Sequence, residues 1–153
     1  MSEHGFDVPP KAPPELLAEW HDLADRVCRE LTRAGLPARR GDREGGRVGA
    51  GVEVHVDPFA DGGGGVYADW RTGEELTTAV VALMEERADF TDPPPLVRHH
   101  RNVHRLMGEA LAGILDSAGF EVERPDPHTY GTAAWVKGQR EAPPPVADVP
   151  RSG

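Results

Sequence analysis

The chain has 153 residues, a net charge of −9 and 38% hydrophobic residues. The length favours one domain, and the negative charge argues against wholesale binding to nucleic acid or to an anionic membrane. A single cysteine, Cys28, excludes an internal disulfide and a zinc site built on a cysteine pair. The chain lacks a secretory signal pattern and any run of roughly 18 apolar residues, so we expect a cytoplasmic protein. High Ala, Gly, Pro and Arg usage is typical of a GC-rich bacterial genome.

The two ends of the chain differ in composition from its middle. Residues 1–13 and 139–153 are rich in proline and poor in large apolar side chains. Such segments bury too little surface to offset the entropy lost on ordering. We therefore expect a disordered head over 1–13, one α+β domain over 14–138, and a disordered proline-rich tail over 139–153.

A first helix is predicted from Pro14 to Ala34. Its apolar residues recur at three- and four-residue steps and form one stripe, Leu16, Trp20, Leu23, Ala24, Val27 and Leu31. Gly35 is suited to end the helix. Pro37 cannot donate a ladder hydrogen bond, so the segment 36–40 is expected to be an edge strand.

A β-hairpin is predicted over 51–71. Apolar and polar residues alternate on both sides of a glycine-rich turn, with Val52, Val54, Val56, Val66, Ala68 and Trp70 on the apolar face. Trp70 is expected to meet Trp20 of the first helix in the core. Two registers keep the apolar face together, and opposite charges favour the one in which Glu53 faces Arg71.

The polar face of this hairpin is the first candidate site. In the favoured register His55 faces Asp69, and Asp57 lies diagonally to both. A histidine beside two carboxylates can hold a divalent cation, or act as a base that an acid orients. The alternative interpretation is a solvated, charge-paired sheet face.

Two more helices and two strands are expected after the hairpin. The second helix begins near Thr72, and the third runs from Leu96 to Ala118 until Gly119 stops it. Its predicted inward residues are Leu96, Val103, Met107, Ala110, Leu111 and Ile114. Strands are expected over 120–123 and 132–137, and the last is apolar on both faces, which suits an internal strand.

Arginines and histidines of the third helix make the second candidate site. Arg98, Arg101 and Arg105 form a ridge opposite the apolar stripe, suited to an acidic partner surface or to a phosphate. The alternative is a solvated face. His100 and His104 lie one turn apart at the apolar stripe, where a core hydrogen bond, a metal pair or a pH-sensitive interface all fit.

The element order α-β-β-β-α-α-β-β predicts an α+β fold. We expect a two-layer sandwich, with three helices packed on one face of a mostly antiparallel sheet of four to five strands. This order resembles that of type III secretion chaperone-like proteins. The resemblance is one of element order and carries no residue role.

The sequence contains no nucleophile elbow, Rossmann fingerprint, EF-hand loop or zinc-finger spacing, so we predict neither an enzyme nor a cofactor. We expect a small partner-binding protein of the adaptor, chaperone-like or immunity type, which is also compatible with a homodimer. The residues expected to bind the partner are Arg98, Arg101, Arg105, Glu53, Tyr67 and Arg71. One alternative is a small-ligand or metal-binding protein that uses the sheet face of His55, Asp57 and Asp69. A second is nucleic-acid binding through the three arginines, which the acidic total disfavours.

Overall fold

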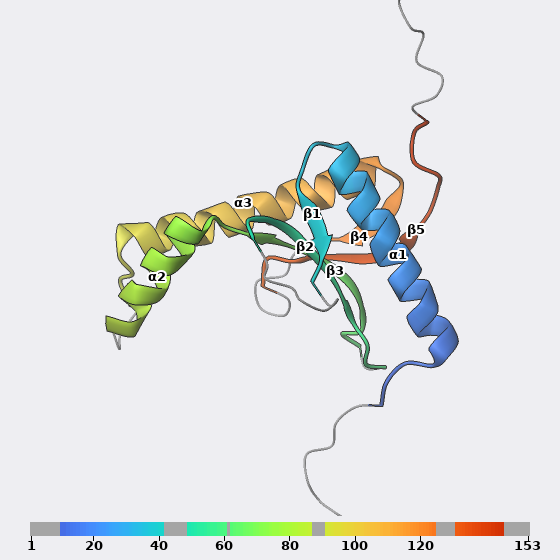
Figure 1. Ribbon diagram of the computed structural model, residues 1–153, viewed down its shortest axis with the longest axis horizontal. Coiled ribbons are helices and arrows are strands. Elements are labelled where there is room, and N and C mark those ends of the chain that lie inside the picture. The colour runs from blue at the N-terminus through green and yellow to red at the C-terminus, as the bar shows by residue number, and fades with distance from the viewer. Residues whose placement is uncertain (1–9, 42–48, 61, 87–90, 125–130, 146–153) are drawn as a thin grey trace, which may run out of the picture.

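The computed structural model describes residues 10–41, 49–60, 62–86, 91–124 and 131–145 (Figure 1). Its elements are α1 (Pro14–Arg33), β1 (Ala38–Arg40), β2 (Gly51–Asp57), β3 (Gly65–Arg71), α2 (Glu74–Glu86), α3 (Pro95–Ser117), β4 (Phe120–Glu123) and β5 (Ala134–Gln139). The predicted α+β class and element order are confirmed. Residues 1–9 and 146–153 of the expected disordered ends lie outside the described residues.

The five strands form one mixed sheet in the order β1-β2-β3-β5-β4. β1 pairs with β2 in parallel, and the other neighbouring strands are antiparallel. β5 is internal, and β1, which follows Pro37, is an edge strand, as expected. The sheet is therefore antiparallel except at this edge.

One face of the sheet carries the hydrophobic core, beneath α1 and α3 (Figure 1). The predicted apolar face of the hairpin is buried there, with Val54, Val66 and Ala68 fully inaccessible. The α1 residues Val27 and Leu31 are also fully buried. Each fully buried Val or Leu side chain stabilises the fold by about 1.5–3 kcal/mol relative to exposure.

Glycines end both helices that cover the sheet. Gly35 has a φ of 102° and Gly119 a φ of 100°, a left-handed conformation that glycine adopts without a steric penalty. At Gly119 a Cβ would also lie 2.5 Å from the carbonyl oxygen of Glu141. The lack of a side chain at Gly119 therefore allows the chain after β5 to pass directly over the end of α3.

The inward face of α3 is rotated from the predicted one. Its buried residues are Val97, Gly108, Leu111, Ala112 and Leu115, while Leu96 and Ala110 are exposed. The prediction was right for Leu111 and wrong for these two exposed residues. It also omitted Gly108 and Ala112, two small residues that are buried on this face.

α2 packs against α3 instead of the sheet, and Val80 is its buried residue. α2 and the first half of α3 extend beyond the sheet (Figure 1), and we call residues 74–86 and 95–106 the helical arm. The arm leaves large apolar side chains exposed, Val81, Met84, Leu96 and Leu106. Among the described residues, no helix is both long and apolar enough to cross a membrane.

The start of α1 lies over the hairpin tip. Ala12 is buried and its backbone N–H donates to the Pro58 carbonyl at 2.8 Å, so residues 10–12 of the expected disordered head are placed. The Trp20 ring lies within 2.9 Å of where a Cβ on Gly64 would be. Trp70 is six residues further along β3, or roughly 20 Å. The predicted meeting of the two tryptophans is therefore wrong.

Candidate binding grooves

The hairpin register differs from the favoured prediction. Glu53 faces Asp69, and His55 faces Tyr67. The charge argument failed because it considered only directly opposed residues. Arg71 still reaches Glu53 along the diagonal, with both Nε and Nη2 3.0 Å from Oε2. Long side chains make such diagonal contacts, so the ion pair does not select the register.

This register separates the predicted metal ligands. His55 Nδ1 lies 3.9 Å from Glu53 Oε1, and Asp57 accepts a hydrogen bond from the Phe59 backbone N–H at 3.1 Å. Asp69 lies directly opposite Glu53 on the neighbouring strand. No group of three or more His, Cys, Asp or Glu side chains placed to hold a metal ion occurs in the part of the chain that the structure describes.

The polar sheet face is also less open than expected. The ring of Tyr67 stacks between His55, at 5.6 Å, and Trp135, at 5.8 Å, and Lys137 Nζ lies 3.6 Å from the Trp135 ring centroid. Tyr67 is 6% exposed and Glu53 is 8% exposed. These two predicted partner-binding residues therefore offer little surface to a partner.

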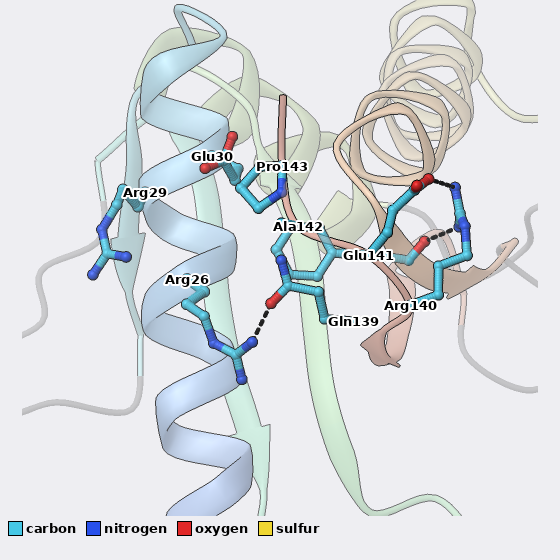
Figure 2. A pocket seen from close by; sticks show the side chains of 9 residues that line it. Arg26, Arg29, Glu30, Gln139, Arg140, Glu141, Ala142 and Pro143 are labelled. Atoms are coloured by element: carbon cyan, nitrogen blue, oxygen red, sulfur yellow. Dashed lines mark hydrogen bonds and ion pairs between the residues drawn. The ribbon is translucent and has the colours of Figure 1, made fainter. Parts of the chain in front are cut away.

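A first groove, of about 500 Å³, lies between α1 and the end of β5 (Figure 2). Its charged lining is Arg26, Arg29, Glu30, Arg140 and Glu141. Arg26 donates a hydrogen bond to the side-chain oxygen of Gln139 across the groove. Arg140 donates to the carboxylate of Asp116 at 3.0 Å and to its backbone carbonyl at 2.7 Å. The chain itself therefore engages Arg26 and Arg140.

A second groove, of about 700 Å³, lies where the helical arm meets the sheet. Its lining residues come from four parts of the chain, Arg39, Gly49, Ala50, Arg71, Thr72, Glu74, Thr77, Thr78, His100 and His104. We call it the arm groove. Of these residues, the sequence analysis singled out Arg71 for a partner and the two histidines for their position, but it missed Arg39.

Arg39 and Arg40 are adjacent in β1 and have opposite roles. Arg40 pairs with the core-facing Val54, and Arg39 pairs with Glu53 on the other face. The Arg40 side chain is 6% exposed and Nη1 lies 2.7 Å from the Asp25 carboxylate on α1. Arg39 donates to the Ala50 carbonyl at 3.3 Å, and among the described residues it has no ion pair. Strand alternation thus sends one arginine to the core-facing side and one to the groove.

Arg71 is held in the arm groove by a buried anchor. Glu53 accepts a hydrogen bond from Arg71 Nε and forms an ion pair with Nη2. The hydrogen bond, opposed by burial and supported by the nearby Glu53 and Asp69 charges, raises the pKa of Arg71. A Cβ on Gly41 would lie 2.3 Å from Glu53 Cγ. Because Gly41 has no side chain, Glu53 can occupy the space beside it.

The histidine pair forms the α3 wall of the arm groove. The rings of His100 and His104 are 4.4 Å apart and tilted by 43°. Partial burial, and then the proximity of His104 and His99, lowers the pKa of His100. His100 is therefore neutral at pH 7, and it gains a positive charge only in more acidic solution.

The predicted arginine ridge lies on the exposed surface of α3. Arg98 Nη1 is 3.4 Å from Asp92, and Arg105 Nη1 is 3.9 Å from Glu109, both in exposed pairs of little energetic weight. Arg101 is exposed and has no ion pair within the described ranges. Comparison with protein-family models, with curated proteins and with solved structures finds no match to this chain.

Proposed function

We propose that the protein is a small, non-catalytic, partner-binding protein and that the helical arm is its docking surface. The observation that carries the proposal is the exposure of apolar residues on an element that packs against little else. Val81 is 48% exposed, Met84 46% and Leu106 53%. Apolar side chains clustered on a protruding element are typical of interaction sites.

The α3 side of the helical arm favours a protein with an acidic surface as the partner, whereas the α2 side carries the glutamates Glu74, Glu75, Glu85 and Glu86. On α3, Leu106 adjoins Arg105, and Arg98 and Arg101 lie one to two turns earlier. Arginines around an apolar contact are typical of protein interfaces, where they pair with carboxylates as the apolar centre is desolvated. Such a partner also complements a local positive patch on a chain whose net charge is −9. A cytoplasmic location is part of this proposal and rests on composition alone.

Arg101→Glu and Leu106→Asp test the arm separately, with Arg29→Glu on α1 as the charge-matched control. Protein prepared from each variant is used to capture partners from a lysate of the source cells at two salt concentrations. We expect one stoichiometric partner that wild type and Arg29→Glu retain and both arm variants lose. Loss of capture at high salt is expected because rim charges are screened.

Two results contradict this proposal. The first is a captured partner that both arm variants retain. The second is a wild-type protein that captures no partner and is either a monomer or a dimer whose mass by light scattering is unchanged in the arm variants, because the arm then binds neither a foreign partner nor a second copy.

A further inference from the structure

The arm groove is lined by hydrogen-bonding side chains from four elements. Arg39 comes from β1, Arg71 from the end of β3 and the histidine pair from α3. The Thr77 hydroxyl of α2 also lines the groove and bonds to the Thr72 hydroxyl at 2.6 Å. These groups are far apart in sequence, and the fold brings them to one cavity.

The two arginines differ in how much of their donor capacity is already used. Arg71 uses Nε and Nη2 on Glu53, which fixes the guanidinium and leaves Nη1 for another acceptor. Arg39 uses Nη2 on a neutral backbone carbonyl at 3.3 Å. Of the two arginines, Arg39 therefore carries the positive charge that the surrounding described residues neutralise less.

The charge balance of the groove depends on pH. Glu74 is the acidic residue of its described lining, against Arg39 and Arg71, and Glu53 behind the wall offsets part of the Arg71 charge. His100 adds positive charge when it takes up a proton in more acidic solution. Because Glu53 and Glu74 offset the two arginines, the groove favours a ligand through its remaining guanidinium donors, and an anion with several acceptor oxygens engages more of them.

We propose that the arm groove binds a phosphate group, either as free inorganic phosphate or as a small phosphomonoester. Phosphate has several acceptor oxygens for donors that come from different walls, and guanidinium groups bind them with charge-assisted hydrogen bonds. A carboxylate has two oxygens in one plane and satisfies fewer of these donors. This site lies at the base of the helical arm. It is separate from the proposed partner surface, which is the exposed side of the arm.

Titration calorimetry tests the proposal with potassium phosphate, glycerol phosphate and potassium acetate at matched ionic strength. We expect saturable binding of either or both phosphates, and weaker binding of acetate. If only glycerol phosphate binds, the ligand is the monoester; if only inorganic phosphate binds, it is the free ion. Absence of saturable heat with both phosphates overturns the proposal, as does acetate binding as tightly as phosphate.

Arg39→Gln and Arg29→Gln locate the site, because each removes one exposed arginine. Arg39→Gln is expected to weaken phosphate binding about tenfold, the effect of losing one charge-assisted contact, while Arg29→Gln keeps the wild-type affinity. His104→Ala provides a second variant on another wall and should also weaken phosphate binding at the same pH, because it removes a ring nitrogen that lines the groove. Equal affinity of Arg39→Gln and wild type, or loss in Arg29→Gln alone, contradicts the assignment to the arm groove.

Discussion

Arginines line both grooves of this protein, and among the described residues each groove has one arginine without an ion pair, Arg29 in the first groove and Arg39 in the arm groove. In the first groove, Arg26 and Arg140 donate to Gln139 and Asp116, and the segment after β5 lies along the opening (Figure 2). In the arm groove, Arg39 meets only a backbone carbonyl among the described residues. The grooves differ in their walls: the arm groove places the histidine pair of α3 beside its arginines, whereas the described lining of the first groove contains no histidine.

The floor of the first groove is part of the core, so the largest stability loss is expected there. Phe120 lines that groove and is fully buried. Phe120→Ala should lower the free energy of unfolding by about 3–5 kcal/mol, through lost burial and a residual cavity. Thr77→Ala in the arm groove should lower it by only about 0.5–1.5 kcal/mol. Urea denaturation measures both, and equal losses would show that the arm groove is built like a core.

Gly41 tests the buried anchor of the arm groove. A side chain there collides with Glu53, so Gly41→Ala should lower the free energy of unfolding by about 1–3 kcal/mol and displace Arg71. Gly113→Ala is the matched control, because a Cβ at Gly113 of α3 meets nothing within 4 Å. The control should be more stable than wild type by about 0.5–1 kcal/mol. A Gly41→Ala protein as stable as wild type would mean that Glu53 has room to move.

The stability effects of replacing Arg140 and Arg39 compare the two grooves directly. Arg140→Gln removes hydrogen bonds to the end of α3 and should lower the free energy of unfolding by about 1–2 kcal/mol. Arg39→Gln should change it by less than about 0.5 kcal/mol, as at other exposed positions. Thermal or urea unfolding of the two variants under the same conditions checks this order. A reversed order would mean that Arg39, and not Arg140, is the arginine that stabilises the fold.

The smallest expected effect is a pH dependence that His100 contributes. Because folding lowers the pKa of His100, the unfolded chain takes up a proton at a higher pH than the folded protein does. This contribution to stability is complete above the ordinary value of about 6.5 and declines as the pH falls below it. The groups that face His100 are His99, His104, Arg39, Arg71 and Glu74.

His100→Gln measures that contribution by subtraction. Urea denaturation at pH 7.5 and pH 5.5 gives the loss of stability on acidification for wild type and for the variant. The loss should be smaller in the variant, since the other titrating groups are shared. An equal loss in both proteins would mean that His100 titrates alike in the folded and unfolded states.

The elements of the fold were predictable because their periodicity is local. Val54 and Val66 alternate with polar residues, and Gly35 and Gly119 end helices, so the sequence predicted strands, helices and their order correctly. The rotation of α3 was not predicted, because its buried face includes Gly108 and Ala112, two small residues outside the predicted apolar stripe. The predicted hairpin register was wrong for a related reason. Arg71 reaches Glu53 from a diagonal position, so their ion pair does not require them to be directly opposed.

The candidate site was only partly predictable. The sequence drew attention to Arg71 and to the histidine pair, but Arg39 is one of two adjacent arginines in a short edge strand. Only its pairing with Glu53 in the sheet shows that it faces away from α1. The convergence of β1, β3 and α3 on one groove is a property of the assembled fold.

A chemical-shift titration with inorganic phosphate tests the central claim most directly. Backbone amide resonances of the wild-type protein are followed while phosphate replaces chloride at constant ionic strength. Saturable shifts are predicted at residues 49–51, 72–78 and 100–104, which surround the arm groove. Shifts confined to residues 26–30 and 139–143, around the first groove, or saturable shifts at neither place, would contradict the account.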